Sequence, residues 1–230
     1  MEITRQQLAS MIDHSLLRPN ATLEELKRVC QEAIEYGFKA VCINPIFVAD
    51  AVSLLKGKDV VVCSVIGFPF GTHSSRTKAI ETNEVIELGA REVDMVIRVG
   101  ALKDKKDQDV VKDIRAVVDA ARGCPVKVIL ETCYLTEEEK VRGCRLVMEA
   151  GAAFVKTSTG FASEGATAED VILMRRTVGK DFGVKAAGGI RTLEDALKMI
   201  EAGANRLGTS GSVAIIQKFD ELKLPLLDIL

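Results

Sequence analysis

One sequence pattern recurs along this chain: an amphipathic stretch ends in Glu-x-Gly, and an apolar run follows directly. It occurs at residues 35–37, 87–89, 149–151 and 201–203. A glycine at this place suits the left-handed backbone conformation that ends a helix. A helix–strand unit repeated in this way is typical of an alternating α/β architecture, so we expect these glycines to be structural.

Eight apolar runs have the length of strands, and they cover residues 11–16, 39–43, 60–66, 92–98, 126–131, 153–157, 183–187 and 205–209. Amphipathic stretches follow them at residues 22–36, 45–56, 74–88, 107–122, 136–150, 167–179, 192–202 and 210–218. Eight strand–helix units predict a (β/α)8 TIM barrel, a single domain over residues 1–230. A doubly wound open sheet is the alternative, but no G-x-G-x-x-G follows the first strand.

The composition of the chain limits the partners, the location and the metal sites that can be expected. The formal net charge is −2 and no basic run is present, so nucleic acid is not an expected partner. No apolar run could cross a bilayer and no apolar signal region begins the chain, which predicts a cytoplasmic protein without membrane contact. The six cysteines stand singly and only two histidines are present. We therefore expect free, mostly buried thiols and no metal site.

Short apolar runs in two neighbouring predicted strands each end on a lysine, Lys156 in Phe-Val-Lys-Thr and Lys185 in Gly-Val-Lys-Ala. Strand alternation would direct both into the barrel, on the side opposite Val155. Two ammonium groups about 4 Å apart repel by about 4 kcal/mol at an effective dielectric of about 20. This repulsion favours a neutral amine that forms an imine with an aldehyde. Alternatively, each lysine reaches the surface as a solvated group.

Asp94 is a carboxylate inside an apolar strand, which makes it a candidate acid–base group. Lys127 is a candidate partner that would hold Asp94 ionised; a merely structural ion pair is the alternative. Alternation places Asp13 and Cys42 at the mouth of the barrel, where we expect them to line the substrate site. The two histidines, His14 and His73, are expected to be structural, His73 at a helix start.

Three loops rich in small residues follow the last three predicted strands, at residues 157–160, 188–192 and 208–212. Backbone N–H groups in such loops bind anions, and barrels often hold a phosphate after the last two strands. The loops therefore predict a phosphate site. The alternative is that the glycines only permit tight turns.

Taken together, these residues form motifs that resemble the deoxyribose-phosphate aldolase family over nearly the whole chain. The matching segments are Ile-Asp-His-Ser-Leu-Leu at 12–17, Ala-Val-Cys-Ile-Asn-Pro at 40–45, Val-Ile-Gly-Phe-Pro-x-Gly at 65–71, Glu-Val-Asp-Met-Val-Ile at 92–97, Lys-Val-Ile-Leu-Glu-Thr at 127–132, Phe-Val-Lys-Thr-Ser-Thr-Gly-Phe at 154–161, Val-Lys-x-Ala-Gly-Gly-Ile-Arg-Thr at 184–192 and Arg-Leu-Gly-Thr-Ser at 206–210.

The resemblance implies a class I aldolase without metal or other cofactor that reversibly cleaves 2-deoxy-D-ribose 5-phosphate into acetaldehyde and D-glyceraldehyde 3-phosphate. It implies that Lys156 forms the imine, that Lys185 activates it and transfers protons, and that Asp94 is the acid–base carboxylate. Family members are commonly homodimers or homotetramers. The implied substrate and phosphate contacts, together with those expected from the strands, are Asp13, Cys42, Lys127, Thr159, Gly160, Gly188, Gly189, Gly208 and Ser210.

Two positions depart from the family pattern. Arg98 stands where many bacterial members have asparagine, and we expect it to point into the mouth and add charge for the phosphate. Gly211 replaces a common serine. Two other functions compete with the aldolase: a metal-dependent phosphosugar aldolase or isomerase, for which the chain offers few nitrogen ligands, and a catalytically silent phosphate-binding barrel, which leaves the buried lysines unexplained.

Overall fold

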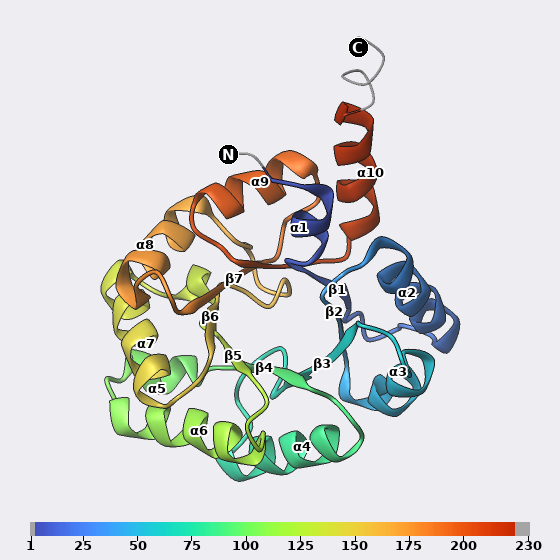
Figure 1. Cartoon of the computed structure of the whole chain (residues 1–230). Helices are drawn as coiled ribbons and strands as arrows, with labels where there is room; N and C mark the ends of the chain where they lie inside the picture. The colour runs from blue at the N-terminus through green and yellow to red at the C-terminus, as the bar shows by residue number, and fades with distance from the viewer. Residues whose placement is uncertain (1–2, 224–230) are drawn as a thin grey trace.

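The apolar runs form a closed ring of eight parallel strands, each hydrogen-bonded to its neighbours in chain order, with the last strand pairing with the first (Figure 1). The computed structural model describes residues 3–223. Its strands are β1 (Ile12–Leu16), β2 (Ala40–Ile43), β3 (Val61–Ile66), β4 (Glu92–Val96), β5 (Val126–Ile129), β6 (Phe154–Lys156), β7 (Gly183–Ala187) and β8 (Arg206–Thr209). The predicted (β/α)8 TIM barrel is confirmed, and the open-sheet alternative is excluded.

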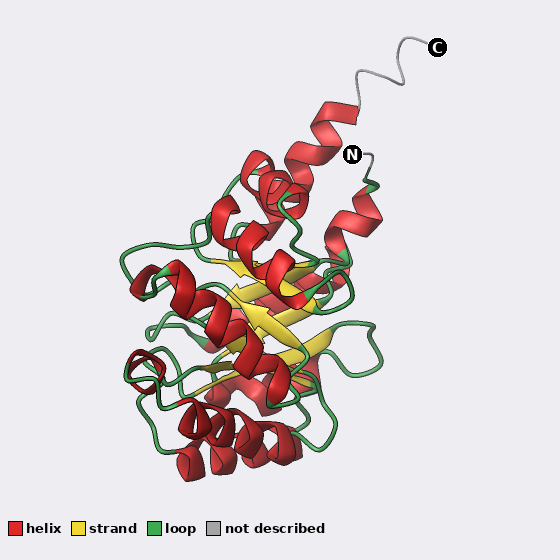
Figure 2. Ribbon diagram, turned by 90° about the vertical axis from the view of Figure 1, so that its left-hand side faces the viewer, coloured by secondary structure: helices red, strands yellow, loops and turns green. Residues whose placement is uncertain are grey.

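Helices surround the strands, as the side view shows (Figure 2). Those that follow each strand are α2 (Leu23–Tyr36), α3 (Val48–Leu54), α4 (Ser75–Glu87), α6 (Asp107–Ala120), α7 (Glu137–Glu149), α8 (Ala168–Val178), α9 (Leu193–Glu201) and α10 (Ser212–Lys223). The short helix η1 (Pro45–Phe47) precedes α3 within the predicted stretch 45–56, whereas the periodicity did not predict three short elements: α1 (Arg5–Ala9), α5 (Val99–Lys103) and η2 (Thr132–Tyr134). Segments of three to five residues are too short to show a helical period.

Local signals set the ends of the helices. In α2 the Thr22 hydroxyl accepts from the Glu25 N–H while the Glu25 carboxylate accepts from the Thr22 N–H, a capping box that the sequence predicts. Gly37 follows α2 with a φ of 74°, in the left-handed region. The other three glycines of the Glu-x-Gly repeat also have positive φ, which confirms their structural role.

The alternation of side chains along the strands produces two chemically different layers. Residues directed outward, such as Val93, Val128 and Val155, pack in the apolar layer between strands and helices. Residues directed inward include the charged groups of β4 to β8 and the cysteines of β2 and β3. The barrel thus places a polar cluster inside an apolar shell. Among residues 3–223 no helix is long and apolar enough to cross a membrane.

Candidate active site

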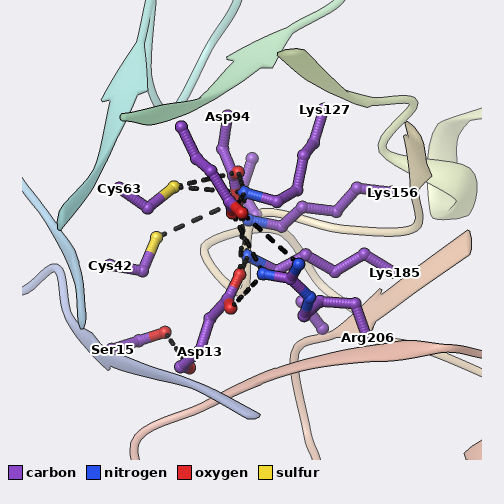
Figure 3. A network of polar contacts seen from close by, with 12 residues as sticks. Asp13, Ser15, Cys42, Cys63, Asp94, Lys127, Lys156, Lys185 and Arg206 are labelled. Atoms are coloured by element: carbon purple, nitrogen blue, oxygen red, sulfur yellow. Dashed lines mark hydrogen bonds and ion pairs between the residues drawn. The ribbon is translucent and has the colours of Figure 1, made fainter. Parts of the chain in front are cut away.

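Strand register brings the predicted catalytic residues together (Figure 3). Lys156 and Lys185 are partners in the β6–β7 pairing, and Asp94 and Lys127 are partners in the β4–β5 pairing. The Asp94 carboxylate lies at the centre: Oδ2 accepts a 2.7 Å hydrogen bond from the Lys156 Nζ and another of 2.7 Å from the Lys185 Nζ. Its Oδ1 accepts from the Lys127 Nζ at 2.8 Å.

A second set of ion pairs extends this arrangement towards β1 and β8. The Asp13 carboxylate accepts from the Lys185 amine and, at 2.8 Å, from the Arg206 guanidinium. Glu92 lies 2.6 Å from the Lys127 Nζ and 3.0 Å from the Arg206 Nη1. We call these seven buried residues the buried charge cluster: Asp13, Glu92, Asp94, Lys127, Lys156, Lys185 and Arg206.

The buried charge cluster holds four cations and three carboxylates. Lys127, Lys185 and Arg206 each contact at least two of the carboxylates. Within the described chain, Lys156 contacts one carboxylate, Asp94, which it shares with two other amines. Lys156 is therefore the cation with the least compensation in the cluster.

The pKa shifts follow from these contacts. Burial would raise the pKa of Asp94, but the ammonium groups of Lys127, Lys156 and Lys185 hold it well below the ordinary value. Burial would lower the pKa of Lys127 and of Lys185, but neighbouring carboxylates raise both, Asp94 for the first and Asp13 with Asp94 for the second. Asp94 is thus a carboxylate and Lys185 an ammonium at neutral pH. For Lys185, attraction to carboxylates outweighs the lysine–lysine repulsion expected from the sequence.

A cavity of about 360 Å³ opens directly above Lys156. Its lining includes six of the residues predicted to contact substrate or phosphate: Thr159, Gly160, Gly188, Gly189, Gly208 and Ser210. Among the residues that the structure describes, Lys156 is the one member of the buried charge cluster that lines it. Arg191, from the predicted phosphate loop 188–192, also lines the cavity, together with Arg18 and Phe161, which were not predicted as site residues.

Three residues expected to contact the substrate do not line this cavity. Asp13, Cys42 and Lys127 are completely buried and are not among the residues lining the cavity. They lie on the inner face of the strands, as alternation predicts. In this structure they contact cluster side chains: the Cys42 Sγ is 3.9 Å from Asp94 Oδ2.

All six cysteines are free, four of them buried, as predicted. Cys63, on β3, is an unpredicted neighbour of the cluster, with its Sγ 3.2 Å from Asp94 Oδ1 and 3.3 Å from the Lys127 Nζ. Ligand atoms of Cys42, Cys63 and Asp94 lie within 4.8 Å of one another, close enough to hold a metal ion. Three lysine amines already bind the Asp94 carboxylate, so a cation here would have to displace them.

Two kinds of contact position the loops around the cavity: a close backbone approach that requires glycine, and hydrogen bonds to the buried Glu131 carboxylate. A Cβ atom added to Gly165 would lie 2.2 Å from the Gly188 carbonyl oxygen, so these two loops approach as bare backbone. Glu131, after β5, has a left-handed backbone with φ 55°. Its buried carboxylate accepts hydrogen bonds from both the N–H and the hydroxyl of Thr159. The Thr159 hydroxyl in turn accepts from the Phe161 N–H at 3.0 Å.

Other predicted residues lie outside this cavity. Arg98 follows the end of β4, which stops at Val96, and precedes α5. It does not line the cavity, so this placement does not support the prediction that it adds charge for the phosphate. Gly211 borders a neighbouring cavity.

The histidines have the structural positions expected of them. His14 Nε2 is 2.7 Å from Glu32 and Nδ1 is 2.9 Å from the Ser212 hydroxyl. Burial lowers the pKa of His14 in spite of the nearby Glu32 carboxylate. His73 is exposed and immediately precedes Ser74, the N-cap of α4.

The barrel and its lysines define a class of protein, the (β/α)8 enzyme with buried lysine side chains near the carboxyl ends of its strands. Sequence comparison makes the assignment specific, because a family model described as DeoC/LacD family aldolase matches residues 7–218. The chain belongs to this family.

Similar proteins agree with this assignment. A deoxyribose-phosphate aldolase of Geobacillus sp. (strain WCH70) is 59% identical over 211 residues, which cover 91% of this chain and 95% of the relative. One of Thermoanaerobacter sp. (strain X514) is 57% identical over 94% of this chain and 99% of the relative. The solved structure of deoxyribose phosphate aldolase from Aeropyrum pernix superposes with a TM-score of 0.89 at 34% identity, covering 95% of this chain and 93% of that one.

Proposed function

We propose that this protein is a class I aldolase that reversibly cleaves 2-deoxy-D-ribose 5-phosphate into acetaldehyde and D-glyceraldehyde 3-phosphate. One observation carries the proposal: the Lys156 amine, the least compensated cation of the buried charge cluster, also lines the cavity. An amine in this position can lose its proton and still reach a carbonyl carbon. The names of the similar proteins support the choice of substrate.

In the cleavage direction, the neutral Lys156 amine attacks C1 of the open-chain sugar, and loss of water forms an iminium ion. The ionised Asp94 carboxylate, acting directly or through a water molecule, accepts the proton of the C3 hydroxyl. The C2–C3 bond breaks, its electron pair forms an enamine on Lys156, and glyceraldehyde 3-phosphate leaves. The Lys185 ammonium supplies a proton towards C2, and hydrolysis of the new iminium ion releases acetaldehyde.

The low pKa of Asp94 and the high pKa of Lys185 support this division of roles. The low pKa keeps Asp94 ionised as a proton acceptor, and the high pKa keeps Lys185 protonated as a proton donor. The amines of Lys185 and Lys156 both contact Oδ2 of Asp94. Lys127 completes the arrangement by holding Asp94 ionised.

The three loops at the cavity support a role in binding the phosphate. Gly160, Gly188 and Gly189 have positive φ, which directs backbone groups in ways that side-chain-bearing residues rarely allow. Gly208, Thr159 and Ser210 complete the lining. We assign the phosphate to the loops after β6, β7 and β8.

We further propose one catalytic domain over residues 1–230 that acts in the cytoplasm in the catabolism of deoxyribose phosphate and nucleosides. A homodimer or homotetramer is the proposed assembly. The support for it is the Aeropyrum pernix aldolase, which is described as a unique tetrameric structure.

Borohydride reduction in the presence of acetaldehyde, followed by peptide mass mapping, tests the nucleophile without assuming the sugar. We expect one reduced adduct, confined to Lys156 and lost in Lys156→Ala. Lys103→Ala, which removes an exposed lysine, serves as the control and should keep the adduct. No adduct on the folded protein would refute imine catalysis and favour the silent or metal-dependent barrel. Turnover that persists in EDTA would count against the metal-dependent one.

A further inference from the structure

The charge of the cavity lining is the starting point. Fifteen residues of the described part of the chain line the cavity; three of these are cations, Arg18, Lys156 and Arg191, and none is a carboxylate. Lys156 is assigned to the carbonyl group, and its Nζ is bound to Asp94. The positive charge for a phosphate dianion must therefore come from Arg18 or Arg191, because the loop glycines supply only backbone N–H groups.

Arg18 reaches this cavity because of the way in which the barrel closes. β1 pairs with β8, so that Asp13 lies beside Gly208 and His14 beside Thr209. Arg18 follows the end of β1 and borders two cavities, in both of which Ser210 is also a lining residue. Arg18, which follows the first strand, therefore lies near the loop that follows the last strand.

The backbone of Arg18 is held while its side chain remains adaptable. Its carbonyl accepts a 3.1 Å hydrogen bond from the Ala21 N–H, and a proline follows it, which restricts its backbone to extended conformations. The side chain is 53% exposed, and its Nη2 lies 2.5 Å from Glu25. Exposed ion pairs of this kind contribute little to stability, so the guanidinium can turn towards a more highly charged partner.

Glu25 is not left unpaired when Arg18 turns away. Its other carboxylate oxygen accepts from the Thr22 N–H at 2.9 Å in the capping box of α2. The planar guanidinium matches two oxygens of a phosphate, which carries more charge than a carboxylate.

We propose that Arg18 is a specificity-determining residue whose guanidinium exchanges Glu25 for the phosphate of the substrate, in concert with the N–H groups of the loops after β6, β7 and β8. The proposal rests on the proposed function, which assigns the phosphate to this cavity. It makes Arg18 the residue by which the enzyme prefers a phosphorylated sugar to the same sugar without phosphate.

Steady-state cleavage of 2-deoxyribose 5-phosphate and of unphosphorylated 2-deoxyribose tests the proposal in Arg18→Gln. A hydrogen-bonded charge pair of this kind predicts a KM for the phosphorylated sugar raised about 10- to 100-fold, with kcat nearly unchanged. The kcat/KM for 2-deoxyribose should stay within about twofold, because no phosphate is present. Inhibition by inorganic phosphate should weaken in parallel.

Arg122→Gln is the matched control, because Arg122 is 56% exposed and forms a 2.7 Å ion pair with Glu87 on α4, far from the loops of the cavity. It should behave as the original protein with both substrates. An Arg18→Gln enzyme with an unchanged KM for the phosphorylated sugar, or with equal losses for both sugars, would overturn the assignment of Arg18. Absence of turnover in the original protein would instead overturn the proposed function, so the two failures are distinguishable.

Discussion

Replacing Lys156 by methionine is expected to abolish imine formation and yet leave the folded state at least as stable as before. The reason is the charge imbalance of the buried charge cluster, in which four cations face three carboxylates. Methionine has a similar length and no charge, so the variant has three of each. A group retained for catalysis at a cost in stability is common in active sites.

The ion-pair distances in the buried charge cluster give the size of the expected changes in stability. The Lys127 Nζ lies 2.6 Å from Glu92 and 2.8 Å from Asp94, so Lys127→Met leaves buried carboxylates without their partner and should cost about 3–5 kcal/mol. The Lys156 Nζ has one carboxylate, Asp94 at 2.7 Å, which Lys185 approaches equally closely. Attraction to Asp94 at 2.7 Å is about 6 kcal/mol at an effective dielectric of about 20. Repulsion from the ammonium groups of Lys185 and Lys127, about 3 kcal/mol for each at about 5–6 Å, offsets it. Lys156→Met should therefore change stability by less than about 1 kcal/mol or increase it by up to about 2 kcal/mol.

Urea unfolding near pH 7, followed by far-UV circular dichroism, measures the difference. The original protein and both variants should be compared at equal protomer concentration, because assembly would add to the apparent stability. Borohydride trapping confirms that the Lys156→Met variant has lost its nucleophile. If Lys156→Met lost as much stability as Lys127→Met, Lys156 would be a fully compensated ammonium, and the reasoning from charge balance would be refuted.

Three further predictions concern the loops, the packing and the pH dependence. Glu131→Ala removes both hydrogen bonds to Thr159 and should raise KM for the phosphorylated sugar about 10-fold in steady-state assays; an unchanged KM would exclude this positioning role. Gly183→Ala places a Cβ 2.2 Å from the Phe154 ring and should cost about 1–3 kcal/mol in urea unfolding, whereas full stability would show that the ring moves freely. The folded pKa of Asp94 lies below its unfolded value, so its contribution is present above that value and is lost as pH falls. The stability deficit of Asp94→Asn should accordingly shrink below about pH 4, and a deficit independent of pH would contradict the assigned ionisation.

Much of the architecture was predictable because it depends on local chemistry. The Glu-x-Gly repeat and the capping residues mark helix ends through backbone conformation and nearby hydrogen bonds, as at Gly37 and Thr22. Strand alternation correctly directed Lys156, Lys185, Asp94 and Lys127 into the barrel. At Arg98, alternation was extended two residues beyond the end of β4, which stops at Val96, so the prediction that Arg98 points into the mouth is not supported.

Periodicity and caps act over a few neighbouring residues, so the sequence predicted the eight strands, the main helices and the residues that face inward, but not the shortest helices. Only the tertiary structure decided which inward charges meet. The register between strands put two lysines on one oxygen of Asp94, where the sequence had predicted mainly their mutual repulsion. Closure of β8 on β1 added Asp13 to the cluster and brought Arg18 to the cavity. Electrostatic energies depend on distances across the barrel, and those distances are set by register and closure, which no periodicity along the chain records.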